Sequence, residues 1–148
     1  MKSTISKSFT LTILSVALFA FTSKPGGESF EILLNNELIV QKHGNEMNSV
    51  KNIRLNEGTQ KDQLTIKYNH CGRAAKNRII TIRNVQNEIL QLYRFDDVAT
   101  PYSPMVINVK DLVTIKKRNG NNLKMYYSST ELKDGRQLAT FQFTDASK

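Results

Sequence analysis

The chain has 148 residues, and its 21 lysines and arginines against 13 aspartates and glutamates give a formal net charge of +8. Its one cysteine, Cys71, excludes an intramolecular disulfide, so the stability of the fold must come from packing. The composition is that of one globular domain behind a leader, without tryptophan, low-complexity tracts or internal repeats.

The N-terminus has the pattern of a secretory signal peptide. Lys2 and Lys7 form a basic start, and residues 9–21 follow without a charge. A membrane-spanning helix needs about 20 apolar residues, and this run is shorter. The alternative to a cleaved signal peptide is an uncleaved N-terminal anchor. We therefore expect residues 1–22 to be a signal peptide and the protein to be exported, either to the periplasm or into the medium.

The end of the leader is placed near Thr22, because cleavage there leaves Ala20 three residues before the new terminus. Cleavage after Ala20 is the alternative and would put the larger Leu18 at that position. Removal of the leader takes away two lysines and no acid, which lowers the net charge to +6. The remaining chain is predicted to be a flexible tether at residues 23–28 and one domain at residues 29–148.

The domain begins with a predicted hairpin. Residues 29–34 and 37–42 are rich in β-formers, and Asn35-Asn36 between them is a good two-residue turn because asparagine tolerates positive φ. Both strands carry apolar residues on both faces, which is typical of strands that lie inside a sheet or are covered by a partner. A loop at residues 43–49 and a short strand at residues 50–55 follow.

Three consecutive strands, at residues 63–70, 78–83 and 88–95, are predicted to organise the domain. The first alternates cleanly, which indicates a half-buried strand. Its inward face comprises Leu64, Ile66, Tyr68 and His70.

The second and third of these strands form a hairpin over the polar residues 84–87. A four-residue loop places Arg83 opposite Glu88, a pairing worth roughly a few tenths of a kcal/mol. The predicted core face of this hairpin comprises Ile80, Ile82, Ile89, Tyr93 and Phe95.

The C-terminal part begins with a loop at residues 96–104, where two prolines oppose continuation of a strand. Residues 105–109 alternate as a strand. Residues 110–118 are predicted to form a short helix, with an acid near its start, three cations at its end and Gly120 beyond it. A strand with a turn at Asn119-Gly120 is the alternative, because the segment contains β-branched residues.

Residues 123–128 and 137–143 are the last predicted strands. About eight or nine strands at short intervals, without long helical patterns between them, favour an all-β fold over a parallel α/β sheet. We therefore predict a single antiparallel β-sandwich, of Greek-key or jelly-roll type, with at most one short helix near residues 110–118.

Two segments carry a resemblance. The runs DQLTIKYNHCGRAAKNRIITI and LKMYYSSTELKDGRQLA resemble small exported bacterial proteins that have no assigned function. The resemblance covers most of the mature chain and implies a β-sandwich domain. It implies no activity and carries over no functional residue.

The pair His70-Cys71 is the most reactive-looking feature of the sequence. Adjacent residues on a strand point to opposite faces, so the two side chains are poorly placed to act together. A zinc site from His43, His70, Cys71 and Asp96 or Asp97 lacks the usual close ligand spacing, and Asp96-Asp97 lacks the alternating pattern of a calcium loop. We therefore predict no metal, no cofactor and no catalytic residue.

Cys71 is instead predicted to be a small packed thiol. Free cysteines behave mostly as buried hydrophobes, so we expect Ala74 and Ala75 to fold back over Cys71 and make it inert. Replacement of Cys71 by serine would then cost about 1–3 kcal/mol by burying a hydroxyl without a partner.

Basic residues are the main candidates for binding. Arg73, Lys76 and Arg78 lie around the connection between two predicted strands, and we expect them to form a rim that binds a ligand. Basic and aromatic residues interleaved on a β-surface suit a glycan or a single-stranded nucleic acid, and export argues against nucleic acid. The alternative for these residues is an ordinary solvated surface.

The sequence therefore predicts an exported, non-catalytic binding or structural module of the cell envelope or periplasm. Its expected partner is an anionic glycan or another envelope protein, and membrane contact is expected only through the signal segment. The alternative is a metal-dependent or thiol-dependent enzyme that uses His70, Cys71 and Asp96 or Asp97.

Overall fold

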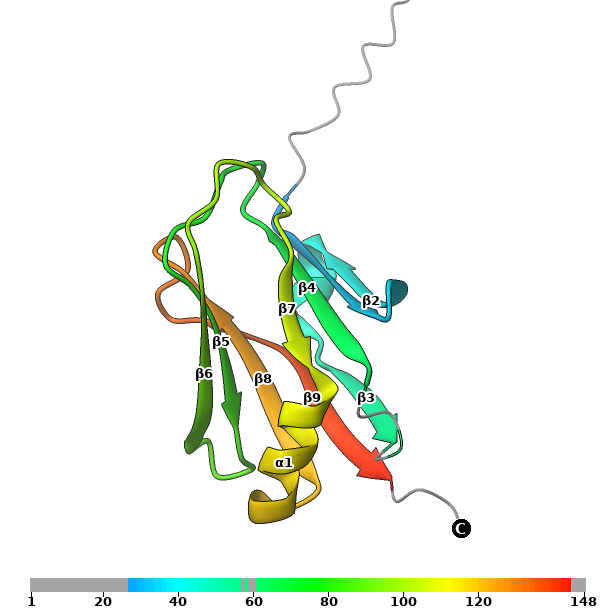
Figure 1. Ribbon diagram of the computed structural model, residues 1–148. Coiled ribbons are helices and arrows are strands. Elements are labelled where there is room, and N and C mark those ends of the chain that lie inside the picture. Colours follow the sequence, from blue (N-terminus) through cyan, green and yellow to red (C-terminus); the bar gives the residue numbers. More distant parts are fainter. Residues whose placement is uncertain (1–26, 57, 59–60, 145–148) are drawn as a thin grey trace, which may run out of the picture.

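The fold consists of two packed sheets with one short α-helix (Figure 1). The computed structural model describes residues 27–56, 58 and 61–144. The predicted signal peptide and residues 23–26 of the predicted tether lie outside these residues. The prediction of an all-β sandwich with a short helix near residues 110–118 is confirmed.

The first sheet has four antiparallel strands in the order β2-β1-β4-β7. These strands are β1 (Ser29–Leu34), β2 (Glu37–His43), β4 (Gln63–Asn69) and β7 (Met105–Asn108). The turn between β1 and β2 forms as predicted, with φ of 52° at Asn35 and 68° at Asn36.

The second sheet has five strands in the order β3-β9-β8-β5-β6. These strands are β3 (Lys51–Asn56), β5 (Arg78–Arg83), β6 (Ile89–Phe95), β8 (Asn122–Ser128) and β9 (Arg136–Thr144). The pair β3–β9 is parallel, so the sheet is mixed rather than wholly antiparallel as predicted. The parallel pair joins segments far apart in the sequence, which no local pattern reveals.

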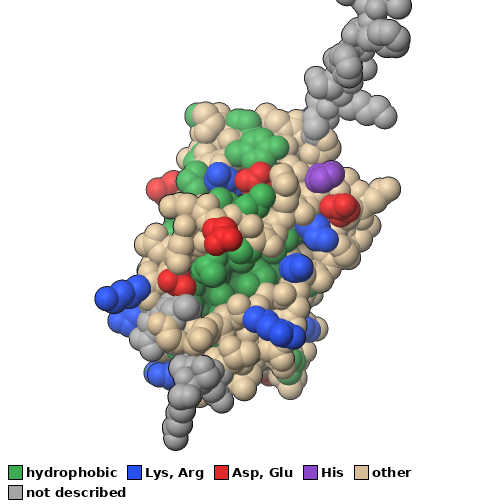
Figure 2. Space-filling view, turned by 90° about the vertical axis from the view of Figure 1, so that its right-hand side faces the viewer, with side chains coloured by type: hydrophobic (Ala, Val, Ile, Leu, Met, Phe, Trp, Pro, Cys, Tyr) green, Lys and Arg blue, Asp and Glu red, His purple; other side chains and the backbone are tan. Residues whose placement is uncertain are grey.

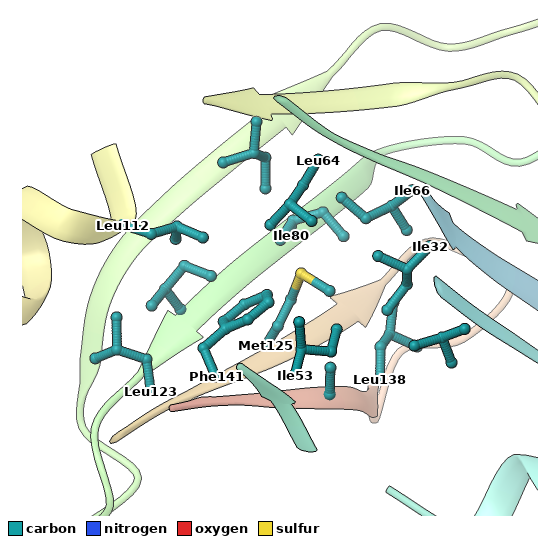
Figure 3. Close-up of a cluster of buried hydrophobic side chains, with 14 of the residues drawn as sticks. Ile32, Ile53, Leu64, Ile66, Ile80, Leu112, Leu123, Met125, Leu138 and Phe141 are labelled. Carbon is teal, nitrogen blue, oxygen red and sulfur yellow. The ribbon is translucent and has the colours of Figure 1, made fainter. Parts of the chain in front are cut away.

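The core lies between the two sheets. Apolar side chains from both sheets and from the helix point toward one another in Figure 3, where ten of them are labelled. Ile32, Leu64, Ile66, Ile80, Met125 and Phe141 are fully buried. This close packing between layers supplies the stability that a disulfide supplies in many exported domains.

The helix α1 (Val109–Asn119) follows β7 directly and buries Leu112 and Val113 against the core. Gly120 ends it with φ of 93°, a backbone conformation that other residues rarely adopt, and its N–H donates to the Lys116 carbonyl at 2.9 Å. The helical prediction is therefore confirmed over the alternative strand.

Two local predictions are wrong. The expected loop after β2 contains a 3₁₀ helix, η1 (Gly44–Asn48), which buries Met47. In the β5–β6 hairpin, an irregularity between Ile82 and Arg83 places Arg83 opposite Ile89 rather than Glu88. Ile89 is 56% exposed and leaves the predicted core face, whereas Ile80 and Ile82 are fully buried on it.

Candidate functional site

A group of polar side chains surrounds His70, at the end of β4. His70 is buried, and its Nε2 lies 2.9 Å from the Tyr127 hydroxyl and 3.3 Å from the Ser129 hydroxyl. Its ring also packs against Tyr68, at a centroid distance of 4.7 Å. His70 is thus held on its Nε2 side by hydroxyl groups and on one face by an aromatic ring.

Glu28 closes the other side of the imidazole. Its Oε1 lies 3.7 Å from His70 Nδ1, and its Oε2 accepts a hydrogen bond from Arg136 Nη2 at 2.8 Å. A tautomer with the proton on Nδ1 faces Glu28 and leaves Nε2 to accept from Tyr127. Glu28 was predicted to belong to a flexible tether, and the ion pair with Arg136 instead fixes it to β9.

Burial controls the titration of this group. Desolvation lowers the pKa of His70, against the opposing charges of Glu131 and Glu28. Burial also raises the pKa of Tyr127 and, together with the Glu28 carboxylate, that of Tyr68. The imidazole and both phenols are therefore neutral near pH 7.

The order Glu28–His70–Ser129 is the acid–base–hydroxyl order of a hydrolase triad. Ser129 is only 6% exposed, and its Oγ accepts the backbone N–H of Glu131 at 3.2 Å. His70 Nε2 is also nearer to the Tyr127 hydroxyl than to Ser129. A nucleophilic serine must reach its substrate, so these contacts favour a structural role for the cluster.

A cavity of about 280 Å³ opens beside His70 and is lined by Glu28, His70, Cys71, Arg73 and Glu131. Cys71 is exposed and has a left-handed backbone with φ of 54°. The prediction of a buried thiol is therefore wrong. The chain turns at Cys71-Gly72 instead of continuing the strand, and of the two alanines expected to cover the thiol, Ala75 is the one that is buried.

The aspartates expected in a metal site have other roles. Asp97 accepts the backbone N–H of Asn77 at 2.7 Å, and the Asp96 carbonyl oxygen accepts from Arg78. The part of the chain that the structure describes contains no group of three or more His, Cys, Asp or Glu side chains that is placed to hold a metal ion.

The predicted binding rim is only partly exposed. Arg73 and Lys76 lie at the surface, whereas Arg78 is buried and donates to the carbonyl oxygens of Asp96 and Ser103. Arg78 shares the inward register of Ile80 and Ile82, so the alternation of β5 contained this signal. Arg78 therefore holds the loop before β7, and ligand binding by Arg73 and Lys76 stays a prediction.

The five-stranded sheet has a charge composition that differs from the rest of the domain. Its strands, all within the described residues, contain no acidic residue and seven basic residues: Lys51, Arg54, Arg78, Arg83, Arg94, Lys124 and Arg136. The strands of the four-stranded sheet contain two acids, Glu31 and Glu37, and two lysines.

Four of these cations lie on the side of the sheet that faces away from the core. We define Arg54, Arg83, Arg94 and Lys124 as the basic face, because their neighbours along each strand point inward. Arg83 and Lys124 are directly opposite on β5 and β8, an arrangement of like charges that costs stability. A destabilising pair of like charges in a sheet whose strands contain no acid points to a role in binding and not in folding.

Two contacts hold the central cations of the basic face apart. The Arg83 guanidinium lies over the ring of Tyr126, 4.6 Å from its centroid. Lys124 Nζ donates to the Val85 carbonyl at 3.1 Å and to Asn87 Oδ1 at 2.8 Å, in the β5–β6 turn. Both positive charges are therefore fixed in place before any ligand arrives.

Figure 2 shows a different surface, with apolar side chains at its centre and both acidic and basic side chains around them. Such mixed charge is ordinary for a soluble domain. The acid-free composition of the five-stranded sheet therefore does not follow from the net charge alone. The sequence did not reveal this composition, because the predicted strand at residues 88–95 contained Glu88 and the membership of each sheet is set by the fold.

Comparison with protein-family models and with curated proteins finds no match. The resemblance to small exported bacterial proteins stays a prediction. Within the described ranges, no helix has the length and apolar character needed to cross a membrane.

Proposed function

We propose that the protein is an exported, non-catalytic binding module of the cell envelope or periplasm, and that it binds an acidic polysaccharide through the basic face. The observation that carries the proposal is a group of four cations on one side of a sheet whose strands contain no acid; two of them, Arg83 and Lys124, are held in place by side-chain contacts. A polyanion that lies across this sheet meets favourable charges and no repelling carboxylate from the strands. The leader-like N-terminus supports export.

Neutral hydrogen-bonding groups around the cations favour a sugar polymer over a lipid surface. Asn52 donates to Gln142 at 3.3 Å, Tyr126 donates to Gln137 at 3.0 Å, and Gln137 donates to Thr140 at 3.1 Å. These amides and hydroxyls suit sugar hydroxyl groups. An anionic bilayer is the competing ligand, because Ile89, opposite Arg83, and Leu92, opposite Thr81, expose apolar side chains on the same face.

The test compares binding of purified protein to a polyuronate by calorimetry. The variant Arg54→Gln, Arg83→Gln, Lys124→Gln removes three cations from the basic face. The matched control Lys110→Gln, Lys117→Gln, Arg118→Gln removes three cations from α1. Each exposed ion pair contributes about 0.2–1 kcal/mol, so we expect the face variant to bind about 3- to 150-fold more weakly and the control to bind nearly as the parent does.

A third variant, Arg73→Ser with Lys76→Ser, tests the predicted rim. Loss of binding in this variant alone would move the site to the cavity beside His70. If the face variant and the α1 control bind polyuronate equally weakly, the binding depends on the overall charge of the protein and not on the basic face. If the protein binds anionic vesicles and does not bind polyuronate, the ligand of the basic face is a membrane surface and not a polysaccharide.

The alternative enzyme, built on His70, Cys71 and Asp96 or Asp97, has less support. Cys71 is accessible beside His70, but Asp97 is occupied by Asn77 and Asp96 lies in the loop that Arg78 holds. Stoichiometric metal in the purified protein would favour this alternative over the binding module.

A further inference from the structure

Two apolar side chains lie among the cations of the basic face. Ile89 is 56% exposed and Leu92 is 40% exposed, and both belong to β6. Ile89 lies opposite Arg83 of the basic face, and Leu92 lies opposite Thr81, which points to the same side of β5. Apolar and positively charged groups are therefore neighbours on one surface.

An irregularity of the β5–β6 pairing determines which apolar side chains reach this surface. In a regular strand, residues three apart point to opposite sides of the sheet. Here the register shifts next to Arg83, and Leu90 is skipped in the pairing. Ile89 and Leu92 therefore both point outward, while Leu90 packs against the core. The exposed apolar pair is thus set by the fold and not by the alternation of the sequence.

One row of paired residues crosses the whole sheet, from β6 to β3, which lie at opposite margins of the sheet in Figure 1. Ile89 lies opposite Arg83 of β5, which lies opposite Lys124 of β8. Lys124 lies opposite Thr140 of β9, which lies opposite Asn52 of β3. With about 4.8 Å between neighbouring strands, the row is roughly 19 Å long. It presents an apolar group, two positive charges, a hydroxyl and an amide, in that order.

We propose, resting on the proposed function, that the acidic polysaccharide is O-acylated and that its ester groups contact Ile89 and Leu92. A carboxylate of the polymer lies between Arg83 and Lys124, where it offsets the mutual repulsion of the two cations. Sugar hydroxyls further along the polymer meet the hydroxyl and the amide at the β3 end of the row. Each part of the row then has a complementary group on one ligand.

The spacing of the row favours an ester on the sugar over the tail of a lipid. Ile89 is one strand spacing, about 4.8 Å, from the nearest cation of the row, so the apolar group of the ligand lies close to its negative charge. A short acyl ester and the carboxylate of one uronate residue are separated by a distance of this order. Membrane-bound surfaces instead bury a whole apolar face about 5–10 Å into the lipid, and here two partly exposed side chains are flanked by cations.

The first experiment compares, by calorimetry, an O-acetylated polyuronate with the same preparation after mild alkaline removal of its esters. The two polymers carry the same carboxylates and differ in their apolar substituents. We expect the parent protein to bind the acetylated polymer more tightly, by roughly 4-fold for each methyl group that becomes buried. Equal binding of both polymers would refute the acyl contact and leave the proposed function intact, whereas binding of neither would refute both.

The second experiment removes the apolar pair. The variant Ile89→Thr, Leu92→Thr keeps a residue that suits a strand at both positions, and it should bind both polymers as weakly as the parent binds the de-esterified one. The matched control Leu38→Thr, Val106→Thr changes side chains on the four-stranded sheet that are 48% and 45% exposed, and it should keep the preference of the parent. A preference that persists in the Ile89 and Leu92 variant would place acyl recognition elsewhere and contradict the proposal.

A third experiment separates the ester from a membrane surface. Vesicles of phosphatidylglycerol and phosphatidylcholine supply negative charge and an apolar interior without a uronate. We expect no sedimentation of the parent protein with these vesicles at concentrations at which it binds the acetylated polymer. Sedimentation that is lost in Ile89→Thr, Leu92→Thr, together with equal binding of the two polymers, would assign the apolar pair to a membrane and overturn the proposal.

Discussion

Replacement of His70 by glutamine should remove a pH dependence of stability that the parent protein shows. His70 is buried, and desolvation lowers its pKa below the ordinary value of 6.5. In the pH interval between the lowered pKa and 6.5, the unfolded chain binds a proton that the folded chain does not. The free energy of unfolding therefore falls as the pH falls below 6.5 and levels off below the folded-state pKa.

The size of the effect follows from one proton. A single group changes the free energy of unfolding by at most about 1.4 kcal/mol per pH unit. Urea unfolding from about pH 7.5 to about pH 5 covers the interval in which an unperturbed histidine titrates. The pKa of Glu131 is lowered by hydrogen bonds from Ser129 and from backbone N–H groups, despite the opposing effect of burial, so its contribution is lost only below about 4.5.

The His70→Gln variant should lose the slope near pH 6 and keep the loss of stability at lower pH. His43→Gln is the matched control, because His43 is exposed on the first sheet. A slope that is equal in the parent and in His70→Gln would refute the assignment to His70. If the free energy of unfolding of the parent protein rises as the pH falls, Glu28 and Glu131 stabilise a protonated His70 imidazole.

Three further predictions concern stability and access. Cys71 should react rapidly with a thiol reagent in the native protein, and Cys71→Ser should change the free energy of unfolding by less than about 0.5 kcal/mol because the side chain is exposed; slow labelling would contradict this. Arg78→Leu should lower the free energy of urea unfolding by about 2–5 kcal/mol, because the Asp96 and Ser103 carbonyl oxygens lose a charged donor. A loss below about 1 kcal/mol would show that Arg78 does not stabilise this loop. Gly120→Ala should cost about 1–3 kcal/mol, since φ of 93° is strained for alanine, and an unchanged thermal midpoint would argue against that strain.

The sequence was most informative where structure is local. The alternation of β4 and the Asn35-Asn36 turn depend on the pleat and on allowed backbone angles, and both were confirmed. The end of α1 was predictable for the same reason, because Gly120 supplies the positive φ that the helix terminus uses.

The errors arise where distant segments meet or where the pleat breaks. The irregularity at Ile82 moves Ile89 off the core face, and alternation cannot reveal it. The surroundings of His70 come from Glu28, Tyr127 and Ser129, which lie far from it in the sequence and are joined only by sheet packing. The sequence therefore identified only His70 of this cluster, and the other residues could be identified only from the fold.

The position of β9 affects how the domain can be assembled. β9 lies between β3 and β8, and it is the last strand of the described chain. Until it is in place, β3 has no strand to pair with and the five-stranded sheet is split in two. Synthesis from the N-terminus therefore cannot complete this sheet until β9 has been made, and non-local pairing of this kind slows folding.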